Sequence, residues 1–307
     1  MSDVDRCVCC GEIVPEGTMV CWNCEHKAPD DHGCFGALVS KKDVRDYRIS
    51  CASTPTEFPK EFELKMPKVK FQGSVSSCVA HAISTTVEYF NSLQENDNEE
   101  MSVGYIYGNR ANTNHTGSGM YVREAIAATC KYGDVKHALF PYNEEVPEII
   151  ERFNAASKEL FEKGEPNRFT SYYRLHSNDE IKTSLLKNGP VIFGMPWYED
   201  IRTVNGVIIT SQKNDLGGHC MVIYGWDERG WKIQNSWSEY WANEGRAILP
   251  YDVEISEAWG IIDKLTKSDI EIVKPYNSKI GKLFAKIINV IYRLRDALKN
   301  IKITVVK

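Results

Sequence analysis

The stretch QGSVSSCVAHA, residues 72–82, decides the fold and raises the first question of chemistry. Cys78 follows a pair of serines and precedes an apolar pattern of helical period, which predicts a helix over residues 78–93. A helix N-terminus carries unpaired N–H groups and partial positive charge, so it lowers the pKa of a thiol placed there. Cys78 is therefore a candidate nucleophile; the alternative is a buried cysteine that only fills the core.

Downstream of this helix, the sequence pattern changes from helical to β-rich near residue 190. Further helices are predicted over residues 120–132, over 145–163, and from Ser177 to about residue 187, where Ser177 and Glu180 form a capping box. Short β-rich runs divided by turn residues follow: PVIFGM, GVIIT, HCMVIYGW, WKIQNSW and GRAILP. A helical first half and an antiparallel second half predict an α+β fold of two lobes with a cleft between them.

A thiolate nucleophile needs a base, a group that orients the base, and hydrogen-bond donors for the oxyanion. The β-rich half supplies His219, which follows two glycines at the start of one strand, and Asn235, which ends the next strand. Gln72, six residues before Cys78, has a side-chain amide that can donate to an oxyanion. These four residues form the candidate catalytic set.

On these motifs the chain resembles the papain-like cysteine peptidases of the C1 family. QGSVSSCVAHA is similar to the family's Gln-Gly…Ser-Cys helix start, GGHCMVIYGW to its histidine strand, and QNSWSEYWANEG to its Asn-Ser-Trp segment. The resemblance covers roughly residues 36 to 260 and is of the bacterial or phage type. It implies a papain-like two-lobe fold and an endopeptidase that hydrolyses peptide bonds through a thioester.

The resemblance also implies a role for each catalytic residue. Cys78 is the nucleophile, paired as a thiolate with the His219 imidazolium, which later protonates the leaving amine. Asn235 holds the imidazole, Trp237 shields that contact from water, and Gln72 donates to the oxyanion. Catalysis needs no cofactor, and the expected substrate-binding residues are Gly117, Ser118, Gly119, Met195, Gly218 and Trp237. The alternative is a C1-like protein that binds peptides or transfers acyl groups without hydrolysis, because a fold does not determine a reaction.

The N-terminus holds five of the ten cysteines, within CVCCGEIVPEGTMVCWNC. Cys7 with Cys10 and Cys21 with Cys24 form two CxxC pairs, the spacing of a tetrahedral four-cysteine zinc site. A module this small lacks a core, so a structural Zn²⁺ ion would supply its stability. Cys9 could replace Cys7 as a ligand, and the alternative to a zinc site is a chance cluster of cysteines. The pattern resembles small zinc ribbons, and such a ribbon is also a candidate site for a protein partner.

Four regions are therefore predicted: a zinc ribbon over 1–28, a linker over 29–60 that runs over the next domain, a papain-like domain over 61–265, and a basic segment over 266–307. Residues 1–60 are too short and too rich in turns for a helical inhibitory propeptide, so control of activity is expected to come from the zinc ribbon or from limited access of substrates.

The basic segment carries ten basic and three acidic residues, a net charge of +7, and apolar residues at helical spacing. It predicts an amphipathic helix that binds a membrane surface or a partner, or that packs on the domain.

Composition excludes several classes of protein. The chain has 26% charged and 42% hydrophobic residues, which is typical of a globular protein, and its net charge of −5 gives no general attraction to nucleic acid. The ribbon itself has a net charge of −3, which argues against a nucleic-acid-binding zinc protein. The sequence shows neither a signal peptide nor an apolar run long enough to span a membrane, so a cytoplasmic location is predicted.

Overall fold

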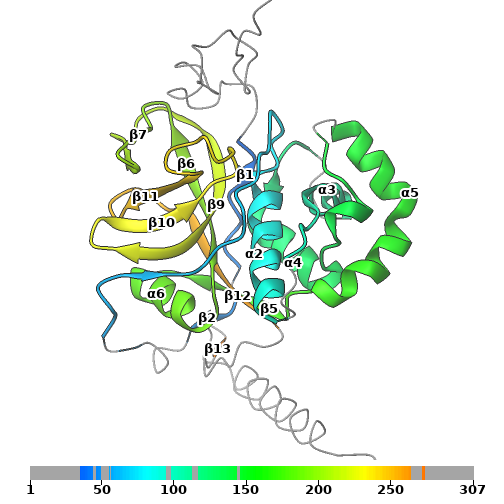
Figure 1. Cartoon of the computed structure of the whole chain (residues 1–307), viewed down its shortest axis with the longest axis horizontal. Helices are drawn as coiled ribbons and strands as arrows, with labels where there is room; N and C mark the ends of the chain where they lie inside the picture. The colour runs from blue at the N-terminus through cyan, green and yellow to red at the C-terminus, as the bar shows by residue number, and fades with distance from the viewer. Residues whose placement is uncertain are drawn as a thin grey trace, which may run out of the picture.

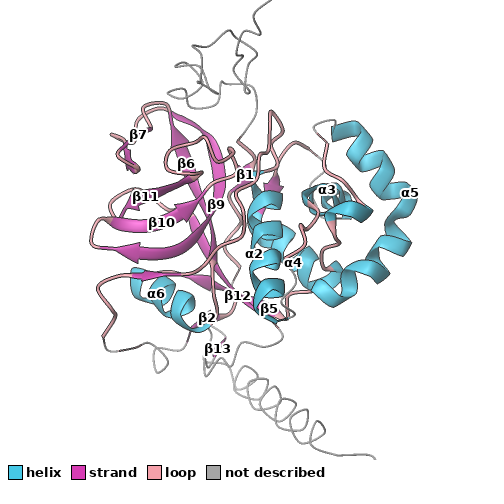
Figure 2. Ribbon diagram, viewed as in Figure 1, coloured by secondary structure: helices cyan, strands magenta, loops and turns pink. Residues whose placement is uncertain are grey.

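The computed structural model describes residues 35–43, 46–49, 55, 57–94, 98–112, 117–143, 146–263 and 272–273. Its helices and strands form two lobes that lie side by side, with helices gathered in one and strands in the other (Figures 1 and 2). The predicted α+β arrangement of a helical lobe and a mainly antiparallel lobe is confirmed. No helix within these described ranges is long and apolar enough to cross a bilayer.

The helical lobe is built around α2, which begins at Cys78. Every residue of α2 from 78 to 91 is buried, because the helix runs along the boundary between the lobes. The helices of this lobe are α2 (Cys78–Gln94), α3 (Val103–Gly108), α4 (Val122–Tyr132) and α5 (Val146–Gly164), with 3₁₀ turns η2 (Asn109–Asn112), η3 (His137–Leu139) and η4 (Glu165–Asn167).

The β lobe is a nine-stranded sheet with the strand order β5-β12-β6-β9-β10-β11-β8-β7, and β3 pairs with β9. All pairs are antiparallel except β11 with β8. The strands are β3 (Phe62–Glu63), β5 (Ser171–Leu175), β6 (Val191–Tyr198), β7 (Arg202–Val204), β8 (Val207–Ile209), β9 (Asp215–Asp227), β10 (Gly230–Gln234), β11 (Arg246–Pro250) and β12 (Glu257–Ile262).

Helix α6 (Asn178–Lys187) packs against this sheet, and Ser177 caps its start as predicted, although the Glu180 carboxylate accepts the His176 N–H rather than the Ser177 N–H of a standard capping box. The Ser177 side chain accepts the Glu180 N–H.

Strand β9 lies between the two lobes and contributes side chains to the core of each. Successive side chains of a strand point to opposite faces. Cys220 and Val222 accordingly belong to the core of the helical lobe, which includes Cys78, while Met221 and Ile223 belong to the core of the β lobe. Strand β9 therefore places Cys220, which follows His219 in the sequence, beside Cys78, the candidate nucleophile.

Two short segments N-terminal to the predicted domain pack against it. Strand β1 (Ala37–Leu38) pairs in parallel with β4 (Met120–Tyr121), and Figure 1 shows β1 between β9 and α2. Strand β2 (Arg48–Ile49) pairs with β13 (Ile272–Val273). Described residues of the predicted linker thus pair with strands of the rest of the chain, and β1 enters the boundary between the lobes.

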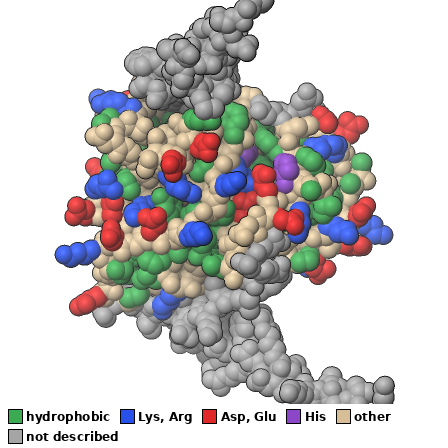
Figure 3. All heavy atoms as spheres, viewed as in Figure 1, with side chains coloured by type: hydrophobic (Ala, Val, Ile, Leu, Met, Phe, Trp, Pro, Cys, Tyr) green, Lys and Arg blue, Asp and Glu red, His purple; other side chains and the backbone are tan. Residues whose placement is uncertain are grey.

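Several predictions concern residues outside the described ranges. The zinc ligands Cys7, Cys10, Cys21 and Cys24 lie there, as does the basic C-terminal segment apart from residues 272–273. On the face of the described domain in Figure 3, basic and acidic side chains are interspersed.

Candidate active site

Cys78 is the first residue of α2 and is fully buried. Burial raises the pKa of its thiol to about 11, although the backbone N–H groups of Cys220 and Gly36 act on the sulfur in the opposite direction. The thiol is therefore protonated at neutral pH in this conformation, despite its place at a helix N-terminus.

His219 lies on β9 and is held by Asn235, which directly follows β10. The His219 Nε2 is 2.8 Å from the Asn235 Oδ1, which also accepts the Ser236 N–H at 2.8 Å. Because this amide oxygen only accepts, Nε2 carries the ring proton. Nδ1 is buried and has no hydrogen-bond partner among the described residues, so its lone pair is available to a proton donor.

Aromatic rings surround this imidazole. The Trp237 ring stacks on it with centroids 4.5 Å apart, and the Trp197 ring meets it edge-on at 5.2 Å. Burial lowers the pKa of His219 to about 4, while its hydrogen bond with Asn235 acts in the opposite direction. Imidazole and thiol are therefore both neutral here.

Gln72 connects the two sides of the site. Its Nε2 donates to the Val75 carbonyl at 2.9 Å, and its Oε1 accepts from the Ser236 hydroxyl at 2.6 Å. Its backbone N–H donates to the Ser236 carbonyl, so the loop before Cys78 is tied to the loop after Asn235. The structure therefore brings all four residues of the candidate catalytic set into one region.

Residues Phe35–Leu38, which we call the strap, pass over this site. On the helical side, the Met120 N–H donates to the Gly36 carbonyl at 2.8 Å. On the β side, the Phe35 ring lies 6.1 Å from the His219 ring and 6.4 Å from that of Trp237. The strap therefore spans both lobes and helps to exclude water from Cys78 and His219.

Two of the predicted substrate-binding glycines border the strap closely. A Cβ atom at Gly119 would lie 2.5 Å from the Gly36 carbonyl oxygen, and one at Gly218 would lie 2.0 Å from the Ala37 carbonyl oxygen. Only glycine permits these approaches. The strap thus occupies the place that the sequence assigns to a substrate.

The other predicted substrate-binding residues differ in exposure and in their contacts. Gly117 and Ser118 are exposed next to Gly119. Trp237 covers His219, as described above. Met195 pairs with His219 across β6 and β9, but it is only 1% exposed and belongs to the core of the β lobe. In this conformation Met195 does not offer a surface to a substrate.

Sequence reasoning missed the strap. CFGALVS, residues 34–40, shows no strand or helix period of useful length, and the segment joins the domain only through contacts with residues far along the chain. The one local signal is Gly36 between apolar residues, which is common in loops of any kind.

The family model described as papain family cysteine protease matches residues 55–260. The chain belongs to the papain family of cysteine proteases. A peptidase C1-like protein of Acanthamoeba polyphaga mimivirus is 26% identical over 78% of this chain and 90% of its own length. A cysteine protease of Blomia tropicalis is also 26% identical, over 63% of this chain and 60% of that protein.

Solved structures of family members share the fold. Xylellain, a cysteine protease from Xylella fastidiosa, has a TM-score of 0.67 at 22% identity and covers 76% of this chain and 97% of its own. The proform of cathepsin B S9 from Trypanosoma congolense has a TM-score of 0.60 at 16% identity and covers 75% of this chain and 86% of its own. The predicted papain-like fold is thus confirmed, whereas the bacterial or phage type stays a prediction.

Proposed function

We propose that this cysteine peptidase hydrolyses peptide bonds of protein or peptide substrates with Cys78 as the nucleophile and His219 as the base. The observation that carries the proposal is the hydrogen bond between His219 Nε2 and Asn235. It leaves Nδ1 as the nitrogen able to take a proton, on a strand whose next residue, Cys220, has its N–H directed at the Cys78 thiol.

The first half-reaction transfers an acyl group to sulfur. As the Cys78 Sγ forms a bond with the substrate carbonyl carbon, its proton moves to His219 Nδ1, and negative charge develops on the carbonyl oxygen. The side-chain amide of Gln72 and the backbone N–H of Cys78 are the proposed donors to that oxygen. The carbon–nitrogen bond then breaks, the leaving amine takes the proton from Nδ1, and a thioester remains.

The second half-reaction hydrolyses the thioester and regenerates the free enzyme. Nδ1 removes a proton from a water molecule as the water oxygen bonds to the thioester carbon. The carbon–sulfur bond then breaks, and the proton returns to sulfur as the carboxylic acid leaves. Asn235 keeps the imidazole in one orientation through both halves, and Trp237 protects their hydrogen bond from water.

A substrate must displace the strap before either step. The strap hydrogen-bonds to β4 and packs on the His219 ring, so it fills the volume that a peptide would need. Displacement would admit water, reverse part of the burial of Cys78 and His219, and favour the ion pair.

Labelling with an epoxide that alkylates active-site thiols tests the catalytic assignment. We expect the reduced wild-type protein to be labelled on Cys78, and the Cys78→Ala variant to lose both labelling and peptide hydrolysis, by about 10⁴-fold or more. Cys130→Ala is the matched control, since this thiol is also largely buried but lies on α4 outside the site. Labelling without hydrolysis of any peptide would favour the non-hydrolytic alternative, and hydrolysis by Cys78→Ala would remove the proposal.

The N-terminal cysteines are proposed to hold a structural zinc ion through Cys7, Cys10, Cys21 and Cys24. Two CxxC pairs support this proposal, since four thiolates at such spacing complete a tetrahedral site. About one zinc ion per chain is expected from metal analysis of the purified protein, and Cys7→Ser combined with Cys21→Ser should abolish it. A zinc content unchanged in that double variant would contradict the proposal.

The location is proposed to be a reducing compartment such as the cytoplasm. Cys78, Cys130 and Cys220 are free thiols, and Val75 stands where many family members have a disulfide-forming cysteine. Both features fit conditions in which disulfides do not persist.

A further inference from the structure

A cavity of about 570 Å³ opens beside β5, α6 and β12. Its size is typical of sites for small molecules. None of its lining residues belongs to the candidate catalytic set or to the strap. The described domain therefore has a possible ligand site that the peptidase chemistry does not use.

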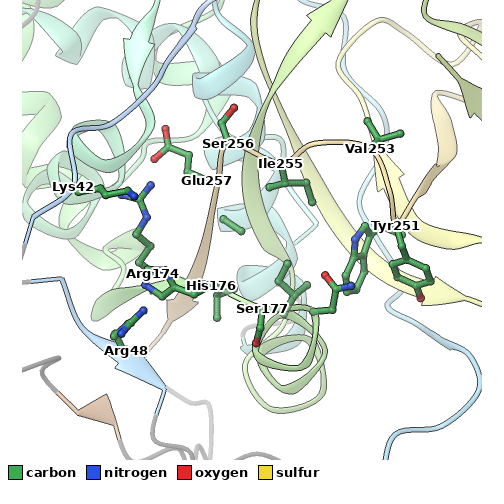
Figure 4. Close-up of a pocket in the computed structure, with 15 residues that line it drawn as sticks. Lys42, Arg48, Arg174, His176, Ser177, Tyr251, Val253, Ile255, Ser256 and Glu257 are labelled. Atoms are coloured by element: carbon green, nitrogen blue, oxygen red, sulfur yellow. The ribbon is translucent and has the colours of Figure 1, made fainter. Parts of the chain in front are cut away.

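Three permanent cations line this cavity: Lys42, Arg48 and Arg174. Figure 4 shows them grouped with His176 at one side of the cavity. One carboxylate, Glu257, also lines it, but its two oxygens accept the Ser40 backbone N–H and the Trp259 indole N–H. The lining therefore carries a net charge of about +2 when His176 is neutral.

Arg174 is the only buried residue among these three cations, since Lys42 and Arg48 are exposed. It is only 7% exposed, and its Nη1 is buried without a hydrogen-bond partner in the described part of the chain. A guanidinium group cannot lose its proton under ordinary conditions, so the buried N–H groups keep their need for an acceptor. The guanidinium lies over the Trp259 ring, 5.2 Å from its centroid, and Arg174 also lines the cavity, so its positive charge attracts an anion held there.

The lowered pKa of His176 is consistent with the positive charge of these side chains. It is lowered first by partial burial and then by the charges of Arg48 and Arg174, with a further contribution from Lys42. Asp46 acts in the opposite direction, but its carboxylate pairs with Arg123. The basic side of the cavity therefore repels protons and attracts anions.

The rest of the lining is mixed: Ser177, Asn178 and Ser256 are polar, and Leu175, Ile181, Trp231, Tyr251, Val253, Ile255 and Ala258 are apolar. Leu175 and Ile181 come from β5 and α6, and Val253 and the Tyr251 ring lie toward the other side in Figure 4. A small inorganic anion would fill only the basic side. An occupant that fits the whole cavity has a charged head and an apolar or ring-shaped body.

We propose that this cavity, which we call the basic pocket, binds a small phosphate monoester whose phosphate pairs with Arg174, Lys42 and Arg48 and whose body packs on the apolar lining. A phosphate dianion matches the net charge of the lining, and its oxygens suit the planar donors of arginine.

The basic pocket is connected to the strap through the chain. Lys42 and Arg48 lie in the segment that continues from the strap, and this segment docks on the body through the bond from the Ser40 N–H to Glu257 and that from the Arg174 N–H to the Tyr47 carbonyl, at 3.0 Å. A ligand held jointly by Arg174 and by this segment stabilises the docked segment. By reciprocity, it also favours the conformation in which the strap closes the catalytic site.

Calorimetric titration with phenyl phosphate tests the site on the full chain. We expect saturable binding to wild type and at least about tenfold weaker binding to Lys42→Ala/Arg48→Ala, since each lost charged hydrogen bond is worth about a factor of ten or more. Both side chains are exposed, so the double variant should fold, whereas Arg174→Met removes a buried group. Arg202→Ala, an exposed base on β7 outside the pocket, is the matched control and should bind as wild type does.

Other ligands separate the two parts of the proposal. Inorganic phosphate should bind more weakly than phenyl phosphate, and uncharged benzyl alcohol should show no saturable binding. Absence of phenyl phosphate binding, or equal binding by the double variant, would overturn the site. Equal affinity for inorganic and phenyl phosphate would overturn the apolar contribution.

The link to the strap has its own readout. Saturating phenyl phosphate should slow the alkylation of Cys78 by iodoacetamide in wild type and not in Lys42→Ala/Arg48→Ala. An unchanged rate in wild type would overturn the link. Binding itself is measured without any peptide substrate, so failure of the catalytic proposal would leave the result on the pocket intact.

Discussion

The catalytic site and the basic pocket both bury ionisable groups, but the groups respond differently. Cys78 and His219 escape the cost of burial by staying neutral, with pKa values moved to about 11 and about 4. Arg174 is nearly as buried and cannot become neutral, so it retains an unsatisfied N–H. Burial therefore leaves an uncharged Cys78–His219 pair in one region and a buried positive charge beside the cavity in the other.

In the proposed mechanism, chemistry depends on restoring the charged Cys78–His219 pair, and the orientation of His219 should matter most. In Asn235→Ala the imidazole loses the acceptor for Nε2, so the tautomer with Nδ1 available is no longer selected. We expect kcat/KM for a peptide substrate to fall by about 10²-fold, the size of effect typical of a misplaced catalytic group.

Asn243→Ala, an exposed asparagine nearby in the chain, is the control for this change. If the Asn235→Ala variant kept the kcat/KM and the thermal stability of the wild type, the hydrogen bond between His219 and Asn235 would not support catalysis.

Loosening the strap should have a smaller effect of opposite sign. Phe35→Ala removes the ring that packs beside His219, Trp197 and Trp237, which should weaken docking by about 1–2 kcal/mol and raise hydrolysis of a peptide substrate by about five- to thirtyfold. Val39→Ala, next to the strap but 61% exposed, should leave the rate unchanged. A lower or unchanged rate in Phe35→Ala would indicate that the strap does not compete with substrate.

Acid should destabilise the folded protein through its neutral buried histidines. The pKa of His219 is lowered to about 4 and that of His81 to about 3, both mainly by burial, against about 6.5 when unfolded. Below pH 6.5 the unfolded chain binds protons that the folded chain does not, so stability is present above 6.5 and is lost progressively toward the folded pKa values.

Each histidine should contribute up to about 1.4 kcal/mol per pH unit in that window. Urea unfolding at pH 7, 6 and 5 measures the slope, and His81→Gln should reduce it. A free energy of unfolding that stays constant from pH 7 to pH 5 would contradict the burial of neutral imidazoles.

Much of the fold follows from local sequence. The helices predicted over 78–93 and 145–163 are observed as α2, Cys78–Gln94, and α5, Val146–Gly164, because apolar period and end signals are local properties. The run that contains His219 is also observed as strand β9, and Asn235 directly follows β10. The short helix α3 and the strands β5 and β12 were not predicted, since they carry no long period of their own.

The strap and the basic pocket could not be predicted in this way. Gly36 meets Met120, and Arg174 meets Tyr47, only because the sheet and the lobes bring distant segments together. Unsatisfied donors such as Arg174 Nη1 become visible only when burial is known for each atom.

The rate of Cys78 alkylation by iodoacetamide at pH 7 tests directly whether the strap closes a Cys78–His219 site. In Gly36→Ala the added Cβ would lie 2.1 Å from the Ser76 carbonyl oxygen, so the strap cannot dock as observed. We expect Cys78 in this variant to react about tenfold faster or more than in wild type, with Val39→Ala equal to wild type. Equal rates in Gly36→Ala and wild type would contradict closure of the site by the strap.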